Sequence, residues 1–231
     1  MARVRQEVDE GLSPAVQLAV AYEGELVVNQ TIGAPSDARF SAFSATKALV
    51  AGVVWQLIDD GRVDVTAPAA RYVPEFGTNG KDVVTVEQLL THTGGFPWAP
   101  LGPDTWDTTE GRRAAFAKWR LTLEPGETYM YHPTAGHWVL GEIIAEVTGM
   151  DHTDAIEKMV TEPLGLPRLV GLAPDAQEGI VDAVGVGAPP TPEEMEEAFG
   201  FKVDVAALIS PDVALNALLV LNEPAVREVG I

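Results

Sequence analysis

Residues 44–61 read SATKALVAGVVWQLIDDG, and this stretch decides how the rest of the chain is interpreted. Its leucine, isoleucine and valine residues recur at helical spacing and Gly61 supplies a stop signal, so we predict a largely buried helix. Ser44 and Lys47 are three positions apart at the start of that helix, which puts both on one face, about one turn apart. At that spacing the lysine amine can reach the serine hydroxyl.

The pair of Ser44 and Lys47 suggests nucleophilic chemistry. A serine hydroxyl is a weak nucleophile at neutral pH, so a neighbouring base must take its proton as it attacks an acyl carbon. Lys47 is the candidate base, and the free N–H groups at a helix N-terminus favour negative charge developing on Ser44. The alternative is that Ser44 caps the helix and that Lys47 is a solvated lysine of the first turn.

Four stretches of the chain carry a family resemblance. They read FSAFSATK at 40–47, LIDDGRVDV at 57–65, VTVEQLLTHTGGFP at 84–97 and EPGETYMYHPT at 124–134. In this order they resemble the serine β-lactamase and penicillin-binding-protein superfamily, most closely the class C β-lactamase-like branch that includes the family VIII esterases. The resemblance implies a β-lactamase/transpeptidase-like α/β (α+β) fold, with a helical region and an antiparallel sheet.

The resemblance also indicates a third site residue, Tyr131. The superfamily's second motif is Tyr-x-Asn, whose tyrosine shares the proton transfer with the lysine, and Tyr131 is the matching position here. A phenol titrates near pH 10 in model peptides, so a tyrosine base needs a nearby cation, for which Lys47 is the natural candidate. Pro133 stands in place of the asparagine and has no amide with which to hold a substrate's acylamino group. The alternative for Tyr131 is a buried aromatic whose hydroxyl bonds the backbone.

The superfamily's third motif, Lys-Thr-Gly or His-x-Gly, is absent from the expected part of the sequence. The resemblance implies that it follows the tyrosine on a strand whose backbone supplies half of the oxyanion hole. Residues 150–231 contain no such motif, and the His-Thr-Gly at 92–94 comes too early. We therefore expect 1–231 to be a single β-lactamase-like domain that is C-terminally incomplete, with a hairpin at about 15–33 and a helical region at about 44–231. The expected partner is a C-terminal complementing segment or chain, and this chain alone is expected to be weakly active or inactive.

Further helices are predicted from their start and stop signals. Residues 85–88 read TVEQ, a capping box, and Thr191 precedes a proline and two glutamates at another predicted start. An apolar stripe over 140–147, ended by Gly149, predicts a helix after the tyrosine motif. Ser210 to Leu221 is predicted as a further helix.

Two residues near the motifs are candidates for substrate binding. Trp98 lies in a loop rich in glycine and proline, where it could rim an acyl pocket; alternatively, it and Trp106 cover the edge of the core. His132 follows Tyr131 and could touch the substrate; alternatively, it is a hydrogen-bonded wall residue.

Composition excludes several function classes. Thirty-four acidic against fifteen basic residues give a net charge of −19, which argues against a nucleic-acid partner because phosphate binding needs concentrated Lys and Arg. The four histidines show no zinc-ligand spacing, so we expect no metal and no cofactor. The N-terminus lacks an apolar signal core and no apolar run is long enough to span a bilayer, so we expect no membrane partner and a cytoplasmic location.

Together these observations predict a serine hydrolase that acts on small-molecule carboxylic esters. Ser44 attacks the carbonyl carbon, Lys47 and Tyr131 transfer the proton, and water then releases the acid from the acyl-enzyme. A β-lactamase or D-alanyl peptidase is an alternative with the same motifs, as is an amidase or acyltransferase. A further alternative is a non-catalytic binding module, or an inactive fragment that requires a complementing chain.

Overall fold

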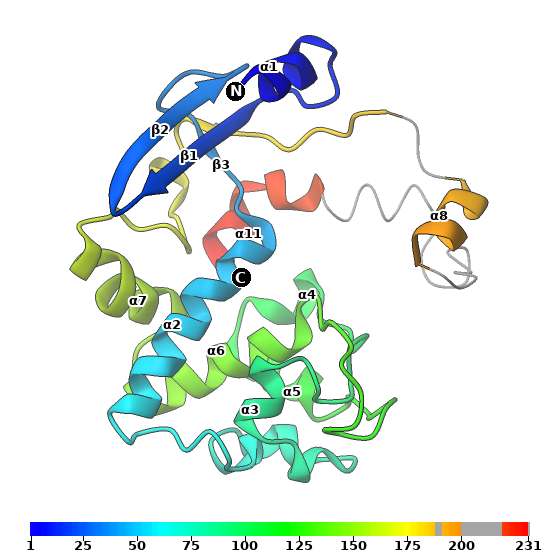
Figure 1. The fold of residues 1–231 in the computed structure, drawn as a ribbon. Coiled ribbons are helices and arrows are strands. Elements are labelled where there is room, and N and C mark those ends of the chain that lie inside the picture. Colours follow the sequence, from blue (N-terminus) through cyan, green and yellow to red (C-terminus); the bar gives the residue numbers. More distant parts are fainter. Residues whose placement is uncertain (188–190, 200–218, 231) are drawn as a thin grey trace. The chain divides into compact units, whose positions relative to one another are not determined.

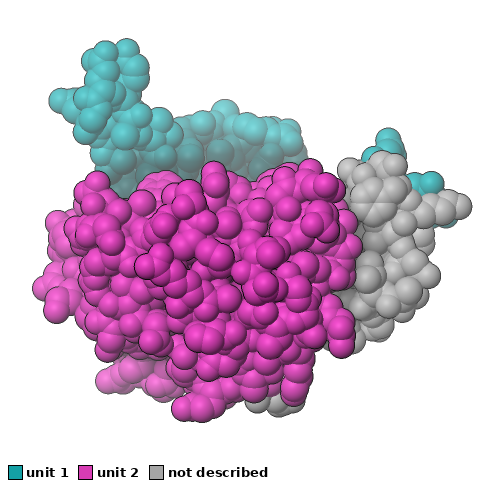
Figure 2. Space-filling view, turned by 90° about the horizontal axis from the view of Figure 1, so that it is seen from below, with its two compact units in different colours: residues 1–41, 177–224 teal, residues 42–176, 225–231 magenta. Residues whose placement is uncertain are grey.

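The computed structural model describes residues 1–187, 191–199 and 219–230 (Figure 1). The helix predicted from Ser210 to Leu221 therefore lies largely outside the described residues. The chain divides into two compact units, residues 1–41 with 177–224 and residues 42–176 with 225–231, which Figure 2 shows in teal and magenta. The single domain expected over the whole chain stays a prediction.

The first unit contains helix α1, Ala2–Asp9, and an antiparallel hairpin of β1, Val16–Tyr22, and β2, Glu25–Ile32. Both turn residues, Glu23 and Gly24, have positive φ angles, of 50° and 85°. Positive φ at both central positions is typical of the tight two-residue hairpin turns whose twist matches that of the strands. The hairpin predicted at about 15–33 is therefore confirmed.

A second, smaller strand pair belongs to the same unit. Strand β3, Arg39–Phe40, pairs in parallel with β4, Ile180–Val181. In the described residues the antiparallel sheet consists of β1 and β2, which agrees with the incomplete sheet expected from the sequence. The parallel pairing was not predicted, because two-residue strands carry no alternating pattern.

The second unit is mainly helical. Its helices are α2, Thr46–Asp59; α3, Val86–Leu90; α4, Pro103–Trp106; α5, Thr109–Phe116; α6, Ala135–Thr148; and α7, His152–Ile156. Helix α7 continues into a π-helical turn, Glu157–Thr161. Helix α11, Pro224–Val229, belongs to this unit apart from its first residue, whereas helix α8, Pro192–Phe199, belongs to the first unit.

The core of this unit forms where α2 packs against α6 and α7, and where α3 packs against α6 (Figure 1). Its fully buried members include Val50, Val53, Val54 and Leu57 of α2 and Leu140, Ile143 and Ile144 of α6. The helices predicted within 44–61 and over 140–147 are confirmed. Helix α6 is capped by Gly149 and α2 ends two residues before Gly61, and both glycines have positive φ. Helix α2 is buried on one face only, since Trp55 on the other face is 64% exposed.

The predicted helix starts are confirmed at two places. The Thr85 hydroxyl accepts the Gln88 N–H, and the Gln88 side chain accepts the Thr85 N–H, which is a capping box at the start of α3. Thr191 and Glu194 make the same reciprocal pair at the start of α8.

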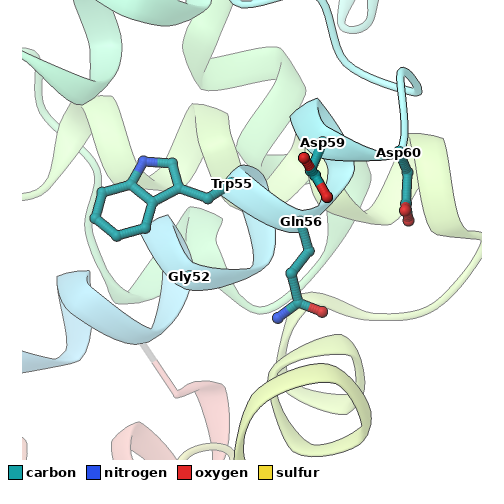
Figure 3. A pocket seen from close by; sticks show the side chains of 5 residues that line it. All are labelled: Gly52, Trp55, Gln56, Asp59 and Asp60. Atoms are coloured by element: carbon teal, nitrogen blue, oxygen red, sulfur yellow. The ribbon is translucent and has the colours of Figure 1, made fainter.

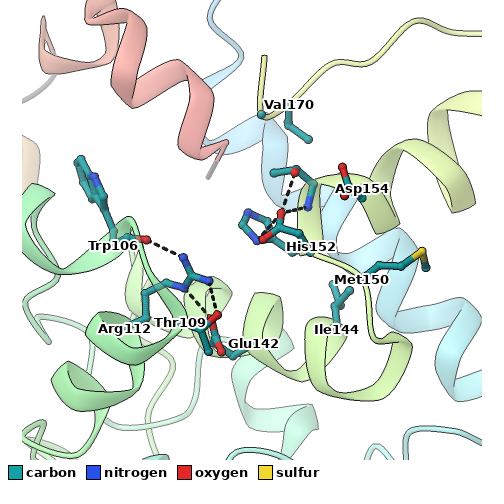
Figure 4. Close-up of polar contacts among 12 residues, drawn as sticks. Trp106, Thr109, Arg112, Glu142, Ile144, Met150, His152, Asp154 and Val170 are labelled. Carbon is teal, nitrogen blue, oxygen red and sulfur yellow. Dashed lines mark hydrogen bonds and ion pairs between the residues drawn. The ribbon is translucent and has the colours of Figure 1, made fainter. Parts of the chain in front are cut away.

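A buried ion cluster joins α5 to α6 (Figure 4). The carboxylate of Glu142, 1% exposed, accepts hydrogen bonds from the guanidinium groups of Arg112 at 2.6 Å and Arg113 at 2.8 Å. Arg112 also donates to the carbonyl of Trp106, while Arg113 extends to the exposed Glu146 at 3.0 Å. The single buried carboxylate therefore neutralises charge on two arginines, one of which is itself buried.

Replacing Glu142 with glutamine is expected to destabilise the fold by about 3 kcal/mol. The change keeps the side-chain volume but leaves the buried Arg112 cation without a counter-charge, and loss of one partner of a buried pair is strongly destabilising. Glu146→Gln is the matched control, because an exposed pair contributes less than about 1 kcal/mol. Urea unfolding of both variants measures the difference. Equal midpoints for the two variants would contradict a charge-balancing role for Glu142.

Candidate active site

Ser44 lies in a 3₁₀ turn, Phe43–Ala45, immediately before α2. The preceding residue, Phe43, has a φ of 46°, which is uncommon for a bulky side chain and is a form of backbone strain often found at functional sites. Ser44 is exposed, and α2 begins without a side-chain cap. The alternative that Ser44 serves as the helix cap is therefore wrong.

Lys47, in the first turn of α2, is half-buried and faces Ser44. Its Nζ donates to Ser44 Oγ at 3.3 Å and to the carbonyl oxygen of Pro133 at 2.6 Å. Pro133 is 86 residues away in the sequence. One oxygen acceptor from the adjacent turn and one from a distant segment thus orient the ammonium group, which excludes the freely solvated lysine that was the alternative.

Tyr131 reaches the same serine from the segment that precedes α6. Its hydroxyl donates to Ser44 Oγ at 2.8 Å, and Lys47 Nζ lies 5.5 Å from the centre of its ring. The ring is 38% exposed, so the alternative of a buried aromatic bonded to the backbone does not apply. The structure therefore brings together the three residues that the sequence singled out, with two side chains converging on one hydroxyl oxygen.

A family model described as beta-lactamase matches residues 2–226. The chain belongs to the beta-lactamase family. It is 30% identical over 189 residues to "Esterase/beta-lactamase LipL" of Mycobacterium tuberculosis, a match that covers 80% of this chain and 38% of that protein.

Solved structures of related proteins share the fold. A penicillin-binding-protein homologue from Caulobacter crescentus superposes with a TM-score of 0.72 at 30% identity, covering 80% of this chain and 53% of that one. A family VIII carboxylesterase gives a TM-score of 0.61 at 31% identity, covering 69% and 47%. The β-lactamase/transpeptidase-like fold expected from the sequence is confirmed, and the chain spans roughly half the length or less of these family members.

The two residues that the sequence suggested for substrate binding, His132 and Trp98, differ in exposure: His132 is buried and Trp98 is exposed. His132 is 2% exposed; its Nε2 accepts the Phe96 N–H at 3.2 Å and its Nδ1 lies 2.7 Å from the Met130 carbonyl. These contacts fit the hydrogen-bonded wall residue, which was the alternative to direct substrate contact. Trp98 is 63% exposed, so it does not cover the core, and its place in an acyl pocket stays a prediction.

Sequence reasoning missed two histidines near the site, His92 and His137. The imidazole of His92 lies 4.7 Å from the ring of Tyr131, and His137 stacks on His92 at 5.6 Å between ring centroids. In the sequence, His92 is part of the His-Thr-Gly at 92–94, which comes too early to be the third motif. His92 lies inside the 84–97 stretch that carries the family resemblance, which was a signal that it could lie near the site. The sequence does not show which distant residue its ring contacts.

The three histidines around Tyr131 are held in the neutral form. Burial, followed by the positive charge of Lys47 and the neighbouring His92 and His132, lowers the pKa of His137 to about 3. Burial, followed by the charge of Lys47, also lowers the pKa of His92. Burial lowers the pKa of His132 despite its bond to Met130. Imidazole rings therefore pack beside Lys47 without adding positive charge at neutral pH.

A surface hollow lies on helix α2, away from Ser44 (Figure 3). It has a volume of about 440 Å³ and is lined by Gly52, Trp55, Gln56, Asp59 and Asp60. These residues lie beyond the first turn of α2, so the hollow is not the site around Ser44.

Among the described residues, no three or more His, Asp or Glu side chains are grouped so as to hold a metal ion. No helix in the described ranges combines the length and apolar character needed to cross a membrane.

Stability is expected to fall steeply on acidification below about pH 6.5. The unfolded chain takes up a proton on His137 there while the folded chain does not until about pH 3, so protonation favours unfolding across this window. Between pH 6.5 and 5 this one residue accounts for about 2 kcal/mol. His137→Phe should show a shallower loss, because the His137 titration is gone and only His92 and His132 still contribute. Urea unfolding at pH 7 and pH 5 tests this, and parallel losses in both proteins would contradict it.

Proposed function

We propose that this chain carries the nucleophile and the proton-transfer groups of a serine hydrolase that acts on carboxylic esters. The supporting observation is the convergence of Lys47 Nζ, at 3.3 Å, and Tyr131 Oη, at 2.8 Å, on Ser44 Oγ. A nucleophile within hydrogen-bond reach of its base, with that base oriented by another group, is the arrangement expected for covalent catalysis. The family relationship to esterases supports the same chemistry.

The proposed reaction has two halves. In the first, Ser44 Oγ bonds to the ester carbonyl carbon as its proton passes to Tyr131 or Lys47; that proton then goes to the departing alkoxide as the ester C–O bond breaks. In the second, water attacks the acyl-enzyme, gives up its proton to the same group, and the proton returns to Ser44 as the acid leaves. Accepting the serine proton requires one of the two groups to be in its basic form.

Ester substrates are favoured over amide-like ones by the surroundings of Pro133. The family asparagine position is occupied here by a residue with no side-chain amide, and the Pro133 carbonyl is engaged by Lys47 at 2.6 Å. An acylamino group would find no amide partner at this position. Hydrolysis of β-lactams or D-alanyl peptides remains the second candidate, because relatives include "Esterase/beta-lactamase LipL" and a protein described as a putative D-alanyl-D-alanine carboxypeptidase from Escherichia coli.

Covalent labelling with a fluorophosphonate is expected to modify Ser44, and Tyr131→Phe should slow the labelling by roughly 10²- to 10⁴-fold, the usual contribution of a positioned acid–base group. Ser44→Ala should abolish it. Intact-mass spectrometry over time measures both effects. A labelling probe suits this chain because it requires only the first half of the reaction.

Two neighbours provide matched controls. Tyr129→Phe removes the hydroxyl of a tyrosine that is 67% exposed and two positions from Tyr131, and Ser41→Ala removes a nearby hydroxyl from the same stretch as Ser44. Both variants should label at the wild-type rate. A short p-nitrophenyl ester and nitrocefin assayed in parallel separate esterase from β-lactamase activity. Unchanged labelling in Ser44→Ala would refute the assignment of the nucleophile.

We also propose that further polypeptide completes the sheet and supplies the second oxyanion donor, either as a continuation of this chain or as a separate bound chain. Four apolar residues of the hairpin, Val20, Tyr22, Leu26 and Val27, are each 42–67% exposed. Within the described residues neither outer edge of the hairpin pairs with another strand. Exposed apolar patches and unpaired strand edges mark surfaces that are usually covered. The backbone N–H of Ser44 would be the first oxyanion donor, and lack of the second costs roughly 10²- to 10³-fold in rate.

The enzyme isolated from its natural source is therefore expected to exceed the 24.6 kDa of this chain. The extra mass should occur in one longer polypeptide or in a second chain that co-elutes with this one. Native mass spectrometry, with the reading frame of the gene, distinguishes these two forms. A stable, monodisperse and fully active monomer of 24.6 kDa would overturn the proposal.

A further inference from the structure

His92 is bonded to the backbone on both sides of Tyr131. Its carbonyl oxygen accepts the N–H of Met130 at 3.0 Å, and its imidazole Nδ1 accepts the N–H of His132 at 3.2 Å. Met130 and His132 are the two chain neighbours of Tyr131. One residue, 39 positions earlier in the sequence, therefore holds the peptide groups that flank the tyrosine.

The same residue also contacts the tyrosine ring. The imidazole of His92 packs on Tyr131 with ring centres 4.7 Å apart and planes inclined by 50°. On its other sides the imidazole stacks on His132 at 5.9 Å and on His137 at 5.6 Å. Those two rings are buried and close-packed, so they limit the movement of the His92 ring. The His92 ring in turn limits the movement of the Tyr131 ring that packs on it.

The bond from His132 also determines which imidazole nitrogen carries the proton. Because Nδ1 of His92 accepts a backbone N–H, the proton of the neutral ring lies on Nε2, and a proton on Nδ1 would face another donor. Burial and the charge of Lys47 lower the pKa of His92, which agrees with a neutral ring. The contact to the His132 N–H is thus maintained at neutral pH.

The backbone of His92 is itself unusual. Its φ of 58° lies in the left-handed region, which is uncommon for residues other than glycine. The following loop holds the same distant segment at further points, since the Thr93 carbonyl accepts the Gly126 N–H and the Gly95 carbonyl accepts the Leu123 N–H. These bonds keep His92 in a conformation that costs free energy and that would relax without them.

We propose that His92 is a positioning residue for Tyr131. By holding both flanking peptides and one face of the ring, it keeps the phenol oxygen 2.8 Å from Ser44 Oγ. His92 transfers no proton and touches no substrate in this role. The inference rests on the proposed function of Tyr131 as a proton-transfer group.

Two substitutions that suit the left-handed backbone test the inference without preventing folding. His92→Gly removes the ring and the Nδ1 acceptor, whereas His92→Asn removes the ring but retains a side-chain oxygen that can accept the His132 N–H. A misplacement of about 1 Å can cost roughly 10²-fold in rate, so we expect the kcat of the complete enzyme for a short p-nitrophenyl ester to fall by about that factor in His92→Gly. KM should change by less than about two-fold, since only positioning for the chemical step is lost. His92→Asn should recover part of the loss in kcat.

The exposed neighbour Thr91, changed to Ala, controls for general disturbance of the loop and should leave kcat unchanged. Crystal structures of the glycine variant provide a readout that does not depend on turnover: the Tyr131 Oη to Ser44 Oγ distance should exceed 3.5 Å, beyond hydrogen-bond range. Wild-type kcat together with an unchanged distance in His92→Gly would overturn the inference. Absence of Ser44-dependent chemistry in the wild-type protein would instead refute the proposed function, and the measured distance would still decide the role of His92.

Discussion

The packing of α2 against α6 is the constraint on which the candidate site depends. Lys47 lies in the first turn of α2, while Tyr131 precedes the start of α6 at Ala135 by four residues. Buried valine, leucine and isoleucine side chains join the two helices, so displacement of one against the other would open cavities in a close-packed core. The 2.8 Å contact between Tyr131 and Ser44 is therefore a consequence of apolar packing some distance from it.

The distribution of positive charge near Tyr131 is a second constraint on the candidate site. Lys47 keeps two oxygen partners, and the imidazoles that surround Tyr131 remain neutral because burial and the lysine both oppose their protonation. A histidine with a normal pKa would add a second positive charge beside Tyr131 at mildly acid pH. Neutral rings instead provide shape and hydrogen-bond acceptors, so the serine is exposed to the field of one cation and the dipole at the start of α2.

The sequence indicated a large part of this arrangement because several of its elements are local. Helical periodicity placed Ser44 and Lys47 one turn apart, the sequence predicted a hairpin at about 15–33, and Thr85 with Gln88 predicted the start of α3. Tyr131 came from family resemblance, since no local pattern links it to residues 87 positions earlier. The parallel pairing of β3 with β4 could not be predicted, because strands of two residues have no period.

The chain by itself thus determined the spacing of Ser44 and Lys47, the helix at whose start they lie and the presence of proline in place of an amide at residue 133. Only the tertiary structure showed that the Pro133 carbonyl orients Lys47, that His92 is bonded on both sides of Tyr131 and that His132 is buried in the wall. The physical reason is the separation of the interacting residues along the sequence. Periodicity and capping report interactions between residues a few positions apart, whereas a hydrogen bond between segments tens of residues apart forms only after the core has brought them together, and it leaves no repeating pattern in the sequence.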